Sequence, residues 1–234
     1  MLLGGLQRMT LIDYPGKVAA TVFTAGCNFR CPFCHNPELV IKSEFLVSPD
    51  DNTLEKEFFE FLKTRQGKLD GVCITGGEPT IQTDLIEFIV KIKKLGFAVK
   101  LDSNGTRPDV LKELLDKKLL DYVAMDIKSG LDNYENVCGI KMDLERIKLS
   151  VDLVKNSGVD YEFRTTVVPG LHTVKEFEDV AKWLAGSQRY ILQKYEDNGK
   201  ILDKTLIERI KGKEIGLEEI KKIMKTTIDD VFIR

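Results

Sequence analysis

The sequence has few of the features that mark secreted, membrane-bound or nucleic-acid-binding proteins. Its 234 residues include only five cysteines, and its 35 basic and 37 acidic side chains leave a formal net charge of -2. An odd number of cysteines does not suit a disulfide framework, and balanced charge creates no global field that attracts nucleic acid or an anionic membrane. No apolar run approaches the roughly 20 residues that span a bilayer, and residues 1–16 lack the order of a signal peptide. We therefore expect a cytoplasmic protein that binds neither nucleic acid nor membrane.

Apolar, β-branched runs alternate with segments of helical periodicity. Six runs are typical of buried parallel strands, at residues 17–25, 71–75, 97–102, 122–127, 161–168 and 189–195. Helical segments separate or follow them, at about residues 50–66, 82–95, 107–118, 143–157, 173–186 and 216–226. A chain of this length with 43% hydrophobic residues can bury one full core. We expect a single α/β domain over residues 1–234, with a flexible, polar segment from about residue 196.

The alternation predicts a parallel sheet with right-handed crossovers. Six strand and helix units suit either an incomplete barrel or an open doubly wound sheet, and periodicity alone fits both. Polar residues follow the carboxyl ends of the predicted strands, at residues 27–36, 76–79, 102–105, 126–128, 169–170 and 193. Because parallel α/β folds bind their ligands at that edge, these residues point to one shared site.

Three cysteines, Cys27, Cys31 and Cys34, lie within eight residues. This spacing lets one loop wrap an iron–sulfur cluster, with each thiolate reaching a different iron. Three ligands on a four-iron cube leave one iron open for a substrate or cofactor, just as an open position distinguishes a catalytic zinc site from a structural one. The alternative is structural zinc with His35 or a distant cysteine as fourth ligand. Zinc sites usually have two short ligand pairs, however, and only Cys31 and Cys34 form one here.

The other two cysteines need no role in this site. Cys73 lies within a predicted strand and is typical of a buried core thiol. Cys138 is isolated among polar residues, so we interpret it as incidental rather than as a ligand of a second cluster.

The cysteine segment resembles the signature of the radical S-adenosylmethionine (SAM) superfamily. The spacing is C-x3-C-x2-C, and an aromatic residue, Phe33, precedes the last cysteine. Within that superfamily, the stretch from residue 5 to residue 40 is similar to the activases of glycyl radical enzymes. The similarity is carried by Asp13-Tyr14-Pro15-Gly16, the strand at 18–23, Ala25-Gly26-Cys27 and Cys34-His35-Asn36. Such activases include the activators of pyruvate formate-lyase and of anaerobic ribonucleoside-triphosphate reductase, and the stretch is most similar to the latter.

This resemblance implies a fold and a chemistry. The fold is an incomplete (β/α)6 barrel whose strand ends hold one 4Fe–4S cluster on Cys27, Cys31 and Cys34. SAM would chelate the open iron, and an electron from a flavodoxin- or ferredoxin-like donor would cleave it to methionine and a 5′-deoxyadenosyl radical. The radical would abstract hydrogen from a glycine of a partner enzyme. The cofactor supplies the difficult chemistry, and the protein supplies positioning and exclusion of water.

The matching positions imply roles at two successive strand ends. Gly76, Gly77 and Glu78 would hold the methionyl amino group, since glycines let a backbone approach a ligand and a carboxylate accepts from an ammonium. The next two strand ends supply oxygens suited to a hard cation. By resemblance to the pyruvate formate-lyase activator, a monovalent cation beside the cofactor carboxylate would be held there, with a lysine nearby; the residues are Asp102, Ser103, Asp126 and Lys128.

Further matching positions complete the cofactor and substrate assignments. Arg164 matches a cofactor-contacting arginine and would need an anionic partner when buried. Phe33 and Val168 would offer apolar surface to the cofactor. Gln193 would replace a histidine that the pyruvate formate-lyase activator has after its sixth strand. Asp13 would hydrogen-bond the backbone of a partner loop lying across the strand ends.

Two other functions fit part of the sequence. A radical SAM enzyme acting on a small molecule, such as a 7-carboxy-7-deazaguanine synthase-like enzyme, shares the cluster and cofactor residues and differs in substrate. The Asp13-Tyr14-Pro15-Gly16 segment favours the activase. A non-catalytic metal-binding module would not explain the glycines and carboxylates at successive strand ends.

Overall fold

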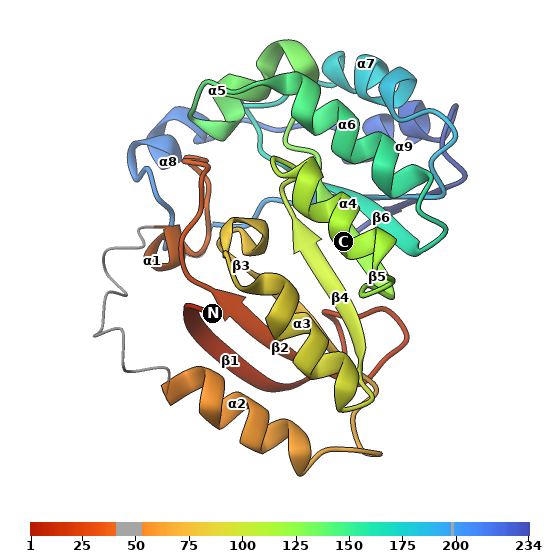
Figure 1. The fold of residues 1–234 in the computed structure, drawn as a ribbon. Helices are drawn as coiled ribbons and strands as arrows, with labels where there is room; N and C mark the ends of the chain where they lie inside the picture. Colours follow the sequence, from red (N-terminus) through yellow and green to blue (C-terminus); the bar gives the residue numbers. More distant parts are fainter. Residues whose placement is uncertain (41–52, 198) are drawn as a thin grey trace.

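Eight strands form one curved sheet in chain order within the residues that the structure describes, 1–40, 53–197 and 199–234 (Figure 1). The structure is a computed structural model. The strands are β1 (Leu3–Thr10), β2 (Ala19–Thr24), β3 (Gly71–Gly76), β4 (Ala98–Ser103), β5 (Tyr122–Asp126), β6 (Asp160–Val167), β7 (Arg189–Lys194) and β8 (Asp230–Ile233). Strand β1 runs antiparallel to β2, and each pair from β2 to β8 is parallel. The sheet curls without pairing β1 to β8, so the predicted incomplete barrel is confirmed.

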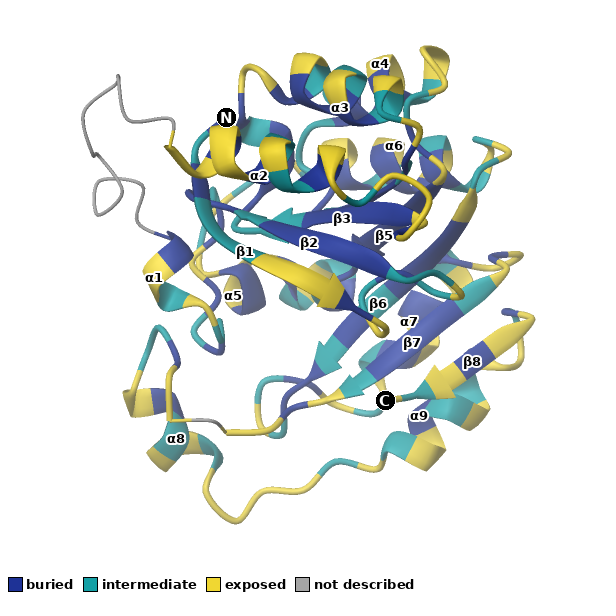
Figure 2. Cartoon of the chain, turned by 90° about the horizontal axis from the view of Figure 1, so that it is seen from below, coloured by how far each residue is buried: buried dark blue, intermediate teal, exposed yellow. Residues whose placement is uncertain are grey.

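Helices cover the outer face of this curved sheet, as Figures 1 and 2 show. The described helices are α1 (Pro37–Val40), α2 (Thr53–Lys63), α3 (Leu85–Lys94), α4 (Pro108–Asp116), α5 (Tyr134–Cys138), α6 (Leu144–Lys155), α7 (Glu176–Trp183), α8 (Thr205–Ile210) and α9 (Leu217–Met224). The short helices α1 and α8 lie beside the strand ends rather than over the sheet (Figure 1). The longer ones bury one apolar stripe each, which amphipathic periodicity predicts. Among the described helices, none combines the length and apolar character that a membrane span needs.

The two faces of the sheet differ in polarity because successive side chains of a strand point to opposite faces. On β4, Val99 and Leu101 are fully buried in the outer core beneath the helices. Lys100 and Asp102 alternate with them and therefore face the barrel interior. The same alternation on β6 buries Phe163 outside and turns Arg164 inward, so the barrel interior is unusually polar for a core.

Two strands and three short helices were missed by the sequence-based prediction. Strand β1 (LGGLQRMT) holds two glycines and several polar residues, and β8 is only four residues long, so neither has a clear apolar run. The six predicted strands correspond to β2 to β7, and the six predicted helices to α2, α3, α4, α6, α7 and α9. The predicted start of the first helix at about residue 50 lies outside the described residues.

The segment after residue 196 contains helix α8, whose Leu206 is fully buried. The backbone N–H of Asp203 donates to the carbonyl of Pro32 at 3.0 Å. This polar segment therefore contacts the cysteine loop directly.

Candidate active site

A pocket opens at the carboxyl ends of the parallel strands, and most of the predicted site residues line it. These are Cys27, Cys31, Phe33, Cys34, Gly76, Gly77, Glu78, Asp102, Ser103, Asp126, Lys128 and Arg164. They come from β6 and from the ends of β2, β3, β4 and β5 with the loops that follow them, so the topology brings together residues that lie far apart in the sequence. Their roles in binding stay predictions.

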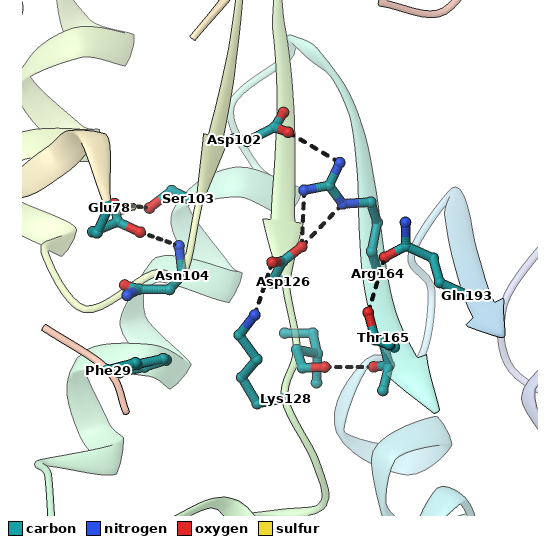
Figure 3. Close-up of polar contacts among 12 residues, drawn as sticks. Phe29, Glu78, Asp102, Ser103, Asn104, Asp126, Lys128, Arg164, Thr165 and Gln193 are labelled. Atoms are coloured by element: carbon teal, nitrogen blue, oxygen red, sulfur yellow. Dashed lines mark hydrogen bonds and ion pairs between the residues drawn. The ribbon is translucent and has the colours of Figure 1, made fainter. Parts of the chain in front are cut away.

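Three predicted residues do not line the pocket. Val168 is fully buried, and its N–H donates to Nδ1 of His172 at 2.9 Å. Gln193 lies on β7 beside the pocket residue Thr166, whose hydroxyl contacts its Oε1 at 3.4 Å (Figure 3). Asp13 lies at the other end of the barrel, in the loop that precedes β2.

The cysteine loop connects β2 to α1 and is held by its own backbone. The N–H of Gly26 donates to the carbonyl of Leu39 at 2.7 Å, and that of Cys34 donates to the carbonyl of Cys31 at 3.0 Å. The Arg30 guanidinium donates to the carbonyls of Cys27 and Phe29, each at 2.7 Å. These contacts hold all three thiols on one wall of the pocket, with none in a disulfide.

The three free thiols that line the pocket fit an iron–sulfur cluster. A cube of four irons takes separate thiolates, one to each iron. Burial raises the pKa of Cys27 to about 12 and also raises that of Cys34, while the Lys128 charge acts in the opposite direction on both thiols. Iron binding would therefore release protons from buried thiols.

Gly76 and Gly77 line the pocket, and they also let two loops come into close contact. A Cβ atom on Gly77 would lie 2.0 Å from the carbonyl oxygen of Gly26, just before Cys27. Gly76 has a φ of +112°, and a Cβ there would lie 2.4 Å from the backbone nitrogen of Thr24. Hydrogen bonds of 2.8 Å from Gly77 N–H to Thr24 and from Glu78 N–H to Gly26 close this contact.

The Glu78 carboxylate joins the ends of β3 and β4 (Figure 3). It accepts from Thr80 N–H at 3.1 Å, from the Ser103 hydroxyl at 2.9 Å and from Asn104 N–H at 2.6 Å. Burial raises the pKa of Glu78, and these donors act against that rise. The carboxylate thus already accepts several hydrogen bonds from the protein. The predicted hydrogen bond from the methionyl amino group would be a further one.

An ion network covers the floor of the pocket (Figure 3). Arg164 lies between two carboxylates, with Nη1 3.1 Å from Asp102 and Nε 2.9 Å from Asp126. Lys128 contacts Asp126 at 2.9 Å, and Lys100 hydrogen-bonds Asp102. Burial alone would raise the pKa of Asp126, but Lys128 and Arg164 outweigh it and hold the pKa well below its usual range. The anionic partners of Arg164 are therefore two aspartates of the chain itself, which the sequence did not reveal.

Replacing Arg164 by methionine is expected to lower the free energy of unfolding by about 3 kcal/mol near neutral pH, because it leaves two partly buried carboxylates without their shared cation. The depressed pKa of Asp126 means that its stabilising contribution is present above the unfolded-state value of about 3.9 and is lost as the pH falls through the folded-state value. The loss in Arg164→Met should therefore shrink at low pH. Urea unfolding at about pH 7 and about pH 3, which lies below the unfolded-state value, measures both effects.

The matched control for this prediction is Arg107→Met. Arg107 pairs with Asp109 at 2.8 Å, but the two side chains are 40% and 55% exposed. An exposed pair contributes at most about 1 kcal/mol, so little change is expected at either pH. A loss in Arg164→Met that is equally large at both pH values would contradict the proposed role of the network.

Several pocket residues were assigned no role of their own from the sequence, although two of them lie in the segments 27–36 and 102–105 that pointed to the site. Phe29, Asn104 and Thr166 line the pocket, yet their residue types suit ordinary packing or turns equally well. The Asn104 side-chain amide donates to Asn28 at 2.8 Å and so links the loop after β4 to the cysteine loop. Lys100 could have been recognised from the sequence, because a lysine in an otherwise apolar strand needs an anionic partner when it is buried.

The sequence model of the radical SAM superfamily matches residues 21–184, which include the cysteine loop, the double glycine and Arg164. The chain belongs to the radical SAM superfamily. Membership implies a 4Fe–4S cluster and SAM, and the residues of this pocket fit both. The chain is accordingly a radical SAM enzyme.

Several characterised or named proteins are similar in sequence to this radical SAM enzyme, over different fractions of its length. "Putative glycyl-radical enzyme activating enzyme MJ1227" of Methanocaldococcus jannaschii is 38% identical over 240 residues, spanning 100% of this chain and 95% of that one. A pyruvate formate-lyase-activating enzyme of Clostridium pasteurianum is 30% identical over 178 residues, or 73% of this chain and 70% of that one. The 7-carboxy-7-deazaguanine synthase of Archaeoglobus fulgidus is 37% identical over 130 residues, or 53% and 54%.

Among solved structures, Streptococcus suis SuiB bound to S-adenosylmethionine matches with a TM-score of 0.63 and 13% identity, covering 89% of this radical SAM enzyme. This chain spans 48% of the length of that structure. At such low identity the match supports the fold alone, and it agrees with the incomplete barrel seen here.

Proposed function

We propose that the protein uses SAM to generate a radical that takes a hydrogen atom from a glycine of a partner enzyme. The observation that carries this proposal is the 38% identity to the Methanocaldococcus jannaschii protein over the full chain, in a structure whose three free thiols face one pocket. The Clostridium pasteurianum relative supports the same reaction class.

The residues of the chain would divide the work at the pocket. Cys27, Cys31 and Cys34 would hold the cluster, which together with SAM supplies a 5′-deoxyadenosyl radical when reduced. Phe29 and Phe33 would shield it from water. With Glu162, whose carboxylate lies 4.0 Å from Arg164, the network pairs three cations with three carboxylates, and this balance suits a positively charged sulfonium cofactor better than an uncompensated cation would.

The partner that we propose is anaerobic ribonucleoside-triphosphate reductase, on the similarity of residues 5–40 to its activators. A flavodoxin- or ferredoxin-like protein would supply the electron, and the reaction would take place in the cytoplasm. A monovalent cation beside the cofactor carboxylate is also part of this proposal. It would bind the free lone pairs of Asp102 and Asp126, because Arg164 already lies between these two carboxylates.

Asp13 suggests where the partner loop would enter. The Asp13 carboxylate accepts from the Thr21 hydroxyl at 2.6 Å, and Thr21 is a fully buried residue of β2. The adjacent Tyr14 packs against Ala19 and Tyr122 at the amino end of the barrel. A partner loop that reaches both Asp13 and the pocket must therefore pass into the barrel interior rather than lie across the strand ends.

Replacing Asp13 by alanine is expected to lower the glycyl-radical yield at least about tenfold, because abstraction tolerates little displacement of the target glycine. Cluster content and reductive cleavage of SAM should stay close to those of the unchanged enzyme, since Asp13 does not line the cofactor pocket. Electron paramagnetic resonance of anaerobic ribonucleotide reductase measures the radical, and 5′-deoxyadenosine release measures cleavage.

Asp160→Ala is the matched control, because Asp160 is an exposed carboxylate at the same end of the sheet. It should keep the full radical yield. An undiminished yield in Asp13→Ala would remove Asp13 from substrate positioning.

The second candidate function is modification of a small molecule. It is favoured by the 37% identity to the Archaeoglobus fulgidus 7-carboxy-7-deazaguanine synthase, although that match covers only 53% of this chain. Release of 5′-deoxyadenosine with no glycyl radical in any candidate partner would favour this function over the activase.

A further inference from the structure

A further cavity lies at the amino ends of the parallel strands, at the opposite edge of the sheet from the pocket that the three thiols line. Its volume is about 410 Å³. The first residues of β4, β5, β6 and β7 and the loop before β2 form its walls. Pockets that bind small molecules occupy about 300 to 1,000 Å³, so the cavity is large enough for a ligand. The residues predicted to hold the cluster and SAM do not reach it.

Two side chains of the cavity wall carry a buried polar atom that has no hydrogen-bond partner among the described residues. Tyr14 is 1% exposed, and its hydroxyl is unpartnered. The Nε of Arg189 is also buried and unpartnered, while Nη1 lies 3.5 Å from the Tyr122 hydroxyl and Nη2 lies 3.8 Å from Asp230. Buried polar groups rarely lack a partner. Since an arginine Nε can only donate, the missing partner must present an acceptor.

The charges around the cavity favour a negatively charged ligand. Within the described residues, neither Lys17 nor Arg189 has a carboxylate within hydrogen-bond distance, although both line the cavity. Asp121 also lines it, but Lys93 already neutralises this carboxylate at 2.7 Å. Asp160 is exposed, so solvent and salt screen its charge. Lysine and arginine side chains with free N–H groups are typical ligands of phosphate and carboxylate groups.

We propose that this cavity binds a small ligand through an oxyanion, a phosphate or carboxylate group. The Arg189 Nε–H and the Lys17 ammonium donate charge-assisted hydrogen bonds to it, and the Tyr14 hydroxyl donates a third. The Lys17 Nζ lies 5.7 Å from the centre of the Tyr14 ring. The centre of that ring lies 5.9 Å from the centre of the Tyr122 ring, whose hydroxyl Arg189 contacts, so the three donors belong to one part of the wall. The site is separate from the cysteine pocket and does not depend on the radical reaction.

The alternative is that ordered water alone fills the cavity and satisfies the two unpartnered atoms. Tyr14→Phe separates the two possibilities, because it keeps the ring and removes only the hydroxyl. Without ligand, this variant should unfold at the same urea concentration as the unchanged protein or at a higher one, since it loses a buried hydroxyl that has no partner in the protein. With ligand, it should bind more weakly.

The test is calorimetric titration of the full chain with its reconstituted cluster, with SAM present to occupy the pocket at the carboxyl ends. The probes are inorganic phosphate and acetate, at constant low ionic strength set with chloride. At least one probe should bind one site per chain with a Kd of about 1 mM or below. Arg189→Met should weaken this binding at least about tenfold and Tyr14→Phe about fivefold.

Arg107→Met is the control, since it removes an exposed arginine outside the cavity and should leave the affinity unchanged. Tighter binding of one probe would support the proposal and identify the group that is recognised. The absence of saturable binding of both probes would overturn it. Equal affinity in Arg189→Met, Tyr14→Phe and the unchanged protein would place the anion elsewhere and would also overturn it. Tetramethylammonium should not bind, and its binding in place of the anions would show that the tyrosine rings recognise a cation instead.

Discussion

Replacing Cys27, Cys31 or Cys34 by alanine is expected to abolish cluster binding, with iron and sulfide falling from about four of each per chain to near zero after anaerobic reconstitution. Each of these thiols faces the same pocket, and within the described residues the remaining cysteines, Cys73 and Cys138, do not line it. Iron and sulfide analysis with the visible absorption spectrum measures the loss. SAM cleavage should disappear together with the cluster.

Cys73→Ala and Cys138→Ala are the controls for this loss. Cys73 is fully buried on β3, where its thiol lies 3.7 Å from the Lys100 amine. Both variants should retain the full iron content. A cluster that survives in any one of the three loop variants, or that is lost from Cys73→Ala, would show that the ligands are assigned wrongly.

Gly77→Ala should be almost as damaging, although Gly77 carries no functional group. The added Cβ would lie 2.0 Å from the Gly26 carbonyl oxygen and 2.6 Å from its carbon, so the backbone before Cys27 must move. The displacement would break the 2.8 Å hydrogen bonds from Gly77 N–H to Thr24 and from Glu78 N–H to Gly26. We expect a loss of more than about 4 kcal/mol in the free energy of unfolding, and little or no cluster. Urea unfolding and iron analysis measure the two effects separately.

Gly130→Ala is the comparison for this variant. Gly130 is buried, but a Cβ there would meet its nearest atoms, on Glu176, only at 3.4 Å. It should change stability by less than about 1 kcal/mol and keep the cluster. If Gly77→Ala bound iron normally, the two loops would not need their close contact, and the structural role assigned to the double glycine would be refuted.

The parallel core of the fold was predictable because burial on both faces leaves a strong apolar pattern. Strands β3 and β5 carry fully buried runs such as Val72 to Ile74 and Val123 to Met125. The edge strands β1 and β8 lack such runs, since one side of each faces solvent or the barrel opening. Short helices such as α5 depend on contacts with distant loops, and periodicity over five residues does not reveal them.

The site was predictable where chemistry depends on spacing along the chain. Three thiols within one loop indicate a cluster whatever the surroundings, and polar residues after buried strands indicate a shared edge. The partners of each side chain were less predictable. Arg164 was expected to contact the cofactor and to need an anionic partner, but the sequence did not show that Asp102 and Asp126 supply one, because this depends on inward-facing positions of β4, β5 and β6 lying side by side in the barrel.

By itself, then, the sequence determined the cysteine loop, the order of strands and helices and the edge of the sheet that carries the site, since each depends on local spacing or periodicity. Only the tertiary structure decided which residues of separate elements contact one another. The contact of Gly77 with Gly26, the position of Asp13 beside Thr21 and the hydrogen bond from the Arg30 N–H to the Cys138 carbonyl all join residues from separate elements. Such contacts follow from how strands curl and helices dock, and neither process leaves a periodic signal along the chain.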